Sequence, residues 1–209
     1  MEFIINKPYP LGNSKIWYSK VNITDTKNLF NHLKTLEFEK GDYNGRHIRR
    51  EQRWYHRFGT YFNPKWKRYR RWESYPYDSY LDMIELRVNY FVKHIINPEE
   101  EWICNSILIN RYENEENLIP KHRDSEVIFG DNPTIAIYSI GAARTIRFTP
   151  VNPYSNVQIN GTKVIDVRLE DGSLLLMSGT VQKYYLHEIL KETEDTEERF
   201  SITCRVHKM

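Results

Sequence analysis

Apolar residues recur at helical spacing in two segments of the first half of the chain. This spacing predicts helices over residues 24–36 and 79–96. Thr24 is placed to cap the first helix, and Ser79 with Asp82 resembles a capping box at the start of the second. The apolar positions are Leu29, Phe30, Leu33 and Leu36 in the first segment, and Ile84, Val88, Phe91 and Ile95 in the second.

After Pro98 the pattern changes to short alternations of apolar and polar residues, which are typical of strands. Asn160-Gly161 is a strong hairpin signal, and Asp171-Gly172 supplies a further turn. Two helices followed by about eight short strands predict a mainly β fold with flanking helices, such as a jelly roll. The predicted strands are 106–112, 134–140, 144–149, 157–159, 162–167, 173–178, 183–187 and 200–206.

The length of 209 residues suits one domain, which we expect to span 1–209. Within it, residues 1–100 would supply the helices and a basic segment, and residues 101–209 the β core. No apolar run is long enough to cross a bilayer, and the first residues do not resemble a secretory signal. The two cysteines, Cys104 and Cys204, suit a reducing compartment. We therefore expect an intracellular monomer, in the cytoplasm or nucleus, with no membrane partner.

Charge is concentrated in residues 46–73, which hold ten Lys or Arg and two acids. This segment carries +8 within a chain of net charge +2, so the remainder carries −6. Eight aromatic residues are interleaved with these cations, and five cations fall within residues 65–71. Cations neutralise phosphates and flat rings stack on exposed bases, so the segment favours a nucleic-acid partner. The alternative is that several rings belong to the core and the arginines extend over them.

One short motif and one distant histidine predict a metal site. In an extended chain His122 and Asp124 point to the same side, and His187 at a predicted strand end can supply a third ligand. Two histidines and one carboxylate hold non-haem Fe(II) on one face and leave positions open. Taken alone, a His-x-Asp pair is more often a surface feature.

The last predicted strand alternates strictly between polar and apolar residues, and its polar face is a candidate anion-binding site. Two arginines and two hydroxyls on one face can bind a dicarboxylate, because the guanidinium pairs with carboxylates through two hydrogen bonds. The alternative is a half-exposed strand whose arginines are solvated. The polar face holds Arg199, Ser201, Thr203 and Arg205, and the apolar face holds Phe200, Ile202, Cys204 and Val206.

Together these segments resemble the AlkB family of Fe(II)- and 2-oxoglutarate-dependent dioxygenases, from about residue 105 to the C-terminus. A looser likeness covers residues 50–55, which resemble the nucleotide-binding lid of that family. The resemblance rests on Asn110-Arg111-Tyr112, His122-Arg123-Asp124-Ser125-Glu126, the residues Ser-Ile-Gly-Ala-Ala-Arg at 139–144, Gly-Ser-Leu-Leu-Leu-Met-Ser-Gly at 172–179, His187 and Arg-Phe-Ser-Ile-Thr-Cys-Arg at 199–205.

The resemblance implies a double-stranded β-helix, or jelly roll, and assigns residues to three tasks. The iron ligands would be His122, Asp124 and His187. The 2-oxoglutarate contacts would be Asn110, Tyr112, Arg199, Ser201, Thr203 and Arg205, with Arg199 on the distal carboxylate and Arg205 near the proximal one. The contacts to the substrate would be Glu126, Arg50, Gln52, Tyr55, Tyr61, Phe62 and Arg144.

The activity implied is oxidative removal of N-methyl groups from bases such as 1-methyladenine and 3-methylcytosine. Fe(II), 2-oxoglutarate and O2 would be consumed, with release of formaldehyde, succinate and CO2. The nucleic acid, DNA or RNA, would be single-stranded or would present a flipped base. Two alternatives stay open: an oxygenase of the same type acting on a protein or small molecule, and a non-catalytic nucleic-acid-binding module.

Overall fold

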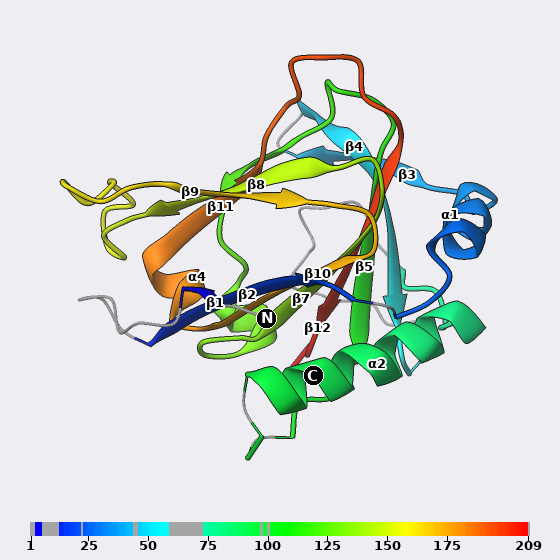
Figure 1. Ribbon diagram of the computed structural model, residues 1–209, viewed down its shortest axis with the longest axis horizontal. Helices are drawn as coiled ribbons and strands as arrows, with labels where there is room; N and C mark the ends of the chain where they lie inside the picture. The colour runs from blue at the N-terminus through cyan, green and yellow to red at the C-terminus, as the bar shows by residue number, and fades with distance from the viewer. Residues whose placement is uncertain are drawn as a thin grey trace.

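The computed structural model describes residues 3–5, 13–21, 23–43, 46–58, 73–96, 98, 99 and 101–208, which form two antiparallel sheets and flanking helices (Figure 1). The larger sheet contains, in spatial order, β1 (Phe3–Ile5), β2 (Ser14–Lys20), β10 (Ser173–Gly179), β7 (Ile135–Gly141), β12 (Arg199–Arg205), β5 (Ser106–Tyr112), β4 (Arg46–His56) and β3 (Glu39–Tyr43). The smaller sheet contains β6 (Ile119–His122), β11 (Tyr185–Ile189), β8 (Arg144–Pro150) and β9 (Ile165–Leu169). The helices are α1 (Thr26–Lys34), α2 (Ser79–Ile95), α3 (Glu126–Phe129) and α4 (Val181–Tyr184).

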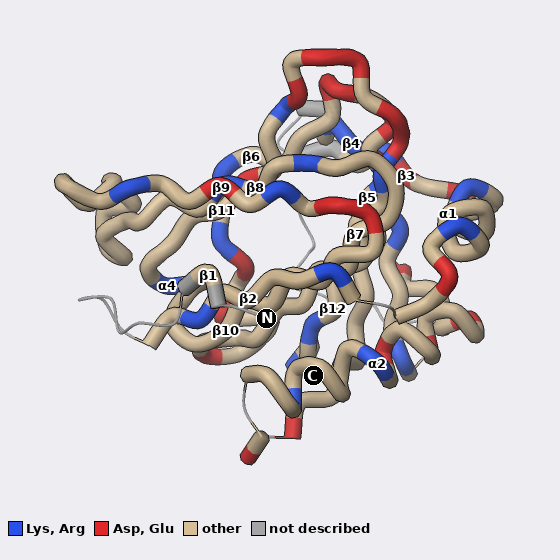
Figure 2. The backbone as a smooth tube through the Cα atoms, viewed as in Figure 1, with Lys and Arg blue, Asp and Glu red and all other residues tan. Residues whose placement is uncertain are grey.

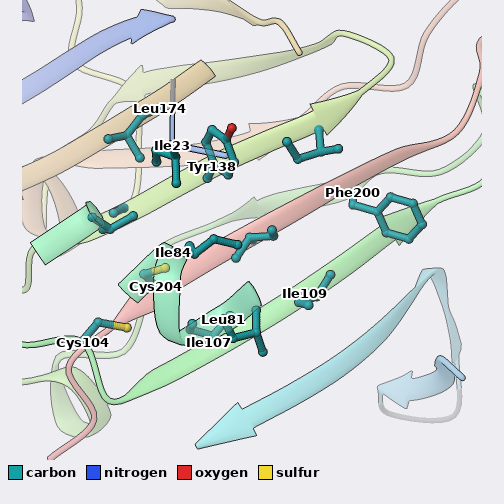
Figure 3. Packing of buried hydrophobic residues seen from close by; sticks show 14 of the residues in the cluster. Ile23, Leu81, Ile84, Cys104, Ile107, Ile109, Tyr138, Leu174, Phe200 and Cys204 are labelled. Atoms are coloured by element: carbon teal, nitrogen blue, oxygen red, sulfur yellow. The ribbon is translucent and has the colours of Figure 1, made fainter. Parts of the chain in front are cut away.

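The two faces of the larger sheet are buried against different partners. One face packs against α1 and α2, and Figure 3 shows Leu81 and Ile84 of α2 beside Ile107 and Cys204 of the sheet. The other face packs against the smaller sheet through a second apolar cluster that includes Phe148 of β8. Two sheets enclosing a core, with helices outside, are the architecture of a jelly roll, so the predicted fold is confirmed.

Both long helices begin with a different capping residue from the one predicted. Asp25 accepts a hydrogen bond from the backbone N–H of Asn28 (3.1 Å). Asp78 accepts one from that of Leu81 (2.9 Å). The predictions of Thr24 and Ser79 as caps are therefore wrong, because an aspartate immediately before the first turn satisfies its free N–H groups.

The predicted strand at 157–159 is also wrong. Only an isolated bridge joins Gln158 to Val151, and Val157 is 64% exposed. The apolar residues of this stretch have no neighbouring strand to bury them. Residues Val181–Tyr184 form a helical turn, so the next strand begins at Tyr185 and not at residue 183.

The first half of the chain contributes strands that the sequence analysis missed. Strands β1 to β4 all join the larger sheet, and β4 pairs directly with β5 along Glu51 to His56. The high charge of β4 masks its alternation, because several of its charged side chains pair within the fold. Within the described residues, no helix is long and apolar enough to span a membrane.

Candidate metal and co-substrate site

Strand pairing brings the two predicted histidine ligands together. His122 at the end of β6 lies opposite His187 of β11, and their ring centroids are 4.3 Å apart. Asp124 follows β6 by two residues, and its Oδ2 lies 3.6 Å from Nε2 of His187. One ligating atom from each of the three residues falls within 4.8 Å of the others. The structure therefore places the predicted triad around one point, although His122 and His187 are far apart in the sequence.

The protonation states of these residues suit a divalent cation. Burial lowers the pKa of His187 to about 3 and also lowers the pKa of His122, so both imidazoles are neutral at pH 7. Burial alone would raise the pKa of Asp124. The positive charge of Arg205 is the largest of the influences that oppose burial, and the pKa of Asp124 lies below its usual value. Two neutral imidazoles and one carboxylate are the donor set of non-haem Fe(II).

Contacts around the triad fix the direction of its ligating atoms. Nδ1 of His122 donates to the carbonyl of Pro120 (2.9 Å), which leaves Nε2 as the lone-pair nitrogen. Oδ1 of Asp124 accepts a hydrogen bond from Arg205 (2.8 Å), and its backbone N–H donates to Gln182 (2.9 Å). Oδ2 of Asp124 is buried without a hydrogen-bond partner. Buried polar atoms are almost always paired, so this orphaned oxygen fits a metal ion.

A row of polar residues crosses the larger sheet beside the triad. In register on adjacent strands lie Gln52, Asn110, Ser201, Ser139 and Ser173, of β4, β5, β12, β7 and β10. Residues in register project from the same face, which here is the face toward the smaller sheet. None of the five is more than 4% exposed. The site therefore has a dry polar floor, to which Ser139 and Ser173 contribute without having been predicted.

Arg199 lies at the end of this floor and has unused hydrogen-bond donors that suit an anion. It is fully buried, and its Nη2 donates to Oγ of Ser139 (2.9 Å). Its guanidinium lies 4.9 Å from the ring centroid of Tyr112. Nε and Nη1 of Arg199 and the hydroxyl of Tyr112 have no hydrogen-bond partner. Burial lowers the pKa of Arg199, but a guanidinium stays charged at neutral pH. An anionic carboxylate fits these unused donors, so the residues suit 2-oxoglutarate as well as iron.

The remaining predicted co-substrate contacts lie on the same wall, with one difference. Asn110 is held by two donors, Nε of Arg50 (2.8 Å) and Nε2 of Gln52 (2.9 Å), and Thr203 is 3% exposed. Arg205 pairs with Asp124, the predicted carboxylate ligand of the metal, a contact that the sequence prediction did not include. The structure thus gives Arg205 a role in orienting that carboxylate.

The predicted substrate contacts are dispersed. Arg50 and Gln52 face the site through Asn110, whereas Tyr55 projects from the opposite face of β4 and is 3% exposed in the helix-side core. Arg144 is fully buried. Tyr55 lies away from the site, so the prediction that it contacts a base is corrected, whereas a contact between Arg144 and the substrate stays a prediction. Glu126 is exposed at the start of α3, where its carboxylate accepts from the backbone of Asn132 (3.4 Å). Two further predicted contacts, Tyr61 and Phe62, lie outside the described residues.

Several cations of the basic segment are used within the fold. Arg57 pairs with Glu85 (2.7 Å), and the guanidinium of Arg53 lies 3.5 Å from the ring centroid of Tyr75. Arg49 lies 4.0 Å from Glu116, in one of the two acidic loops that follow β5 and β11 (Figure 2). These three cations therefore have partners within the protein. The five cations of residues 65–71 lie outside the described residues.

Comparison with known proteins agrees with this site. The family model for the 2OG-Fe(II) oxygenase superfamily matches residues 19–205. Alpha-ketoglutarate-dependent dioxygenase alkB homolog 3 of Homo sapiens is 34% identical over 115 residues, which cover 54% of this chain and 40% of that protein. DNA oxidative demethylase ALKBH2 of Arabidopsis thaliana is 27% identical over 117 residues, 49% of this chain and 37% of that protein. The chain thus spans less than half the length of these relatives.

A solved structure supports the fold independently. The structure of OsALKBH1 aligns with a TM-score of 0.60 and 12% identity, covering 91% of this chain and 97% of that chain. The residues that the family model matches, 19–205, span the triad, the polar floor and Arg199. The chain belongs to the 2OG-Fe(II) oxygenase superfamily, and its similarity to named proteins places it with the AlkB homologues.

Proposed function

We propose that this chain is an Fe(II)- and 2-oxoglutarate-dependent demethylase of N-methylated nucleic-acid bases. The observation that carries the proposal is the convergence of His122, Asp124 and His187 beside Arg199, a buried guanidinium with unused donors. Two similar proteins support the choice of substrate, because one is named an alpha-ketoglutarate-dependent dioxygenase and the other a DNA oxidative demethylase.

The chain's own residues would bind and orient the reactants. His122, Asp124 and His187 would hold iron from one side, and Arg205 would keep the carboxylate of Asp124 turned toward it. Arg199 would hold the distal carboxylate of 2-oxoglutarate. Bound iron, with 2-oxoglutarate and O2, supplies the oxidising power to hydroxylate an N-methyl group. The hydroxymethyl group then leaves as formaldehyde, and 2-oxoglutarate becomes succinate and CO2.

A base inside a duplex cannot reach a buried metal, so the substrate must be single-stranded or flipped out. The cations of residues 65–71 would neutralise phosphates. Glu126, exposed two residues after the ligand Asp124, would favour a base that carries positive charge. Adenine methylated at N1 and cytosine methylated at N3 are such cationic bases, so we propose them as substrates.

Turnover of defined oligonucleotides tests the proposal. Purified protein with Fe(II) and 2-oxoglutarate is incubated with single-stranded DNA or RNA containing 1-methyladenine, 3-methylcytosine or no methyl group. We expect formaldehyde and the unmodified base only from the methylated strands. If the protein consumes 2-oxoglutarate but no methylated strand increases the rate, the proposal is contradicted and a protein or small-molecule substrate is favoured.

The substitution Glu126→Gln tests the proposed preference for charged bases. It keeps the size of the side chain and removes the charge. Activity should fall on 1-methyladenine and 3-methylcytosine but not on a neutral methylated base such as N6-methyladenine. Equal activity of parent and variant on all three bases would show that Glu126 takes no part in substrate choice.

A further inference from the structure

Arg144 is a second fully buried guanidinium at the end of the site occupied by Arg199. It is the first residue of β8 and alternates with Ile146 and Phe148, which face the core between the two sheets. Its Nη2 donates to the carbonyl of Asn114 (2.9 Å), and its Nε has no hydrogen-bond partner. The side chain therefore projects between the sheets, and its donors are only partly used.

Strand connections place Arg144 and Arg199 at the same end of the molecule. Gly141, the last residue of β7, lies opposite Arg199 in the larger sheet. The turn that follows is held against the start of β12 by a hydrogen bond from the N–H of Ala142 to the carbonyl of Glu198 (3.0 Å), and β8 begins two residues later. Burial lowers the pKa of Arg144, attraction from the carboxylate of Glu192 opposes this effect, and repulsion from the charge of Arg199 lowers the pKa further. The two guanidinium groups are thus close enough to interact.

Glu192, the carboxylate whose charge attracts Arg144, is itself paired with Arg168 (2.6 Å). Within the described parts of the chain, neither Arg144 nor Arg199 forms an ion pair with a carboxylate, although both are fully buried. The hydroxyl of Tyr112, which adjoins Arg199, is also buried without a partner. Burying charged groups without a counter-charge in direct contact is costly, so two neighbouring buried cations favour an anionic ligand.

We propose that Arg144 is a second anchor for the distal carboxylate of 2-oxoglutarate, so that it acts with Arg199 and Tyr112 to require a dicarboxylic co-substrate. This inference rests on the co-substrate of the superfamily and is independent of the base that is demethylated. The competing explanation is that Arg144 only holds the loop after β5 through the carbonyl of Asn114.

Binding measurements with two ligands distinguish these explanations and require no turnover. The protein is loaded with Mn(II), and calorimetry measures the affinity for 2-oxoglutarate and for 2-oxopentanoate, which has the same carbon chain without the distal carboxylate. Arg144→Met should weaken 2-oxoglutarate binding at least about 10-fold, because a hydrogen bond to a charged group is lost. It should leave the weak binding of 2-oxopentanoate unchanged. Arg147→Met, from the solvent side of the same strand, is the matched control and should change neither affinity.

Equal weakening of both probes by Arg144→Met, or no weakening of either, would overturn the proposal. If Arg144→Met does not fold, Arg144→Lys serves instead, since lysine keeps the charge and loses the planar fork. It should weaken 2-oxoglutarate binding selectively and to a smaller extent. If the wild-type protein binds 2-oxopentanoate as tightly as 2-oxoglutarate, neither arginine contributes to binding of the distal carboxylate.

Discussion

Both faces of strand β12 are buried, but they differ in whether their polar atoms find hydrogen-bond partners within the protein. On the helix side, Phe200 and Ile202 are fully buried, and Phe200 packs edge-to-face on Phe30 with ring centroids 5.5 Å apart. On the site side, Arg199 is also fully buried, but two of its nitrogens have no partner. The helix side is complete without ligands, whereas the site side retains unused donors. On this strand, burial alone does not distinguish the core face from the site face, whereas the two unpaired nitrogens of Arg199 do.

The largest effect is expected at the metal. Asp124→Ala removes the only carboxylate of the triad, so it should abolish metal binding and turnover. The fold should survive, because the core clusters on both sides of the sheet are untouched. Equilibrium dialysis with Mn(II) and circular dichroism measure the two properties. A variant that binds metal as tightly as the parent would show that the triad is not the metal site.

The next effect separates Arg199 from its neighbours on the same strand. Arg199→Ala should raise the 2-oxoglutarate concentration needed for half-maximal turnover steeply, since losing one partner of a buried charge pair costs about 3–5 kcal/mol. Arg199→Lys should rescue only partly, because lysine lacks the fork. An unchanged requirement for 2-oxoglutarate in Arg199→Ala would mean that the polar face of β12 does not hold the co-substrate.

The helix side should respond in the opposite way. Ile202→Ala leaves a cavity in the core beneath α2, so the free energy of unfolding should fall by about 2–5 kcal/mol. The affinity of the folded protein for 2-oxoglutarate should stay the same, because Ile202 projects away from the site. Urea unfolding and calorimetry measure the two quantities. A large loss of co-substrate affinity would show that the two faces are not independent.

The smallest effect concerns the basic segment, whose most charged part lies outside the described residues. Neutralising Lys65, Lys67, Arg68, Arg70 and Arg71 together should weaken nucleic-acid binding about equally across sequences. It should also flatten the salt dependence, because fewer counterions are released. Turnover of 2-oxoglutarate without nucleic acid should persist. Neutralising the exposed Lys20, Lys27 and Lys93 is the control, and an equal effect of both variants would exclude a specific role for the segment.

The faces of β12 could be predicted from the sequence because a strand alternates with period two. Phe200 and Ile202 fall on one side and Arg199 and Ser201 on the other, wherever the strand lies in the sheet. The pair of His122 and Asp124 was predictable for the same reason. Such local periodicity needs no knowledge of neighbouring strands.

What the sequence could not provide is the order and register of those neighbours. Ser139 joins the polar floor only because β7 pairs with β12, and Arg205 meets Asp124 only because the two sheets face each other. The error at Tyr55 has a different origin. Gln52 and Tyr55 are three residues apart, so in a strand they must lie on opposite faces, but the charge of β4 concealed that it is a strand.

Thermal stabilisation by ligand tests the central claim, that the site side of β12 is completed by the co-substrate and the helix side is not. Ligand that binds only the native state adds about 2.7 kcal/mol at 100 times Kd, and each kcal/mol raises the Tm of a chain of this size by roughly 2–4 °C. When 2-oxoglutarate is added to the Mn(II)-loaded proteins, the parent and Ile202→Ala should show equal shifts from different starting temperatures. Arg199→Ala should show little or no shift. A full shift in Arg199→Ala, or its loss in Ile202→Ala, would contradict the account.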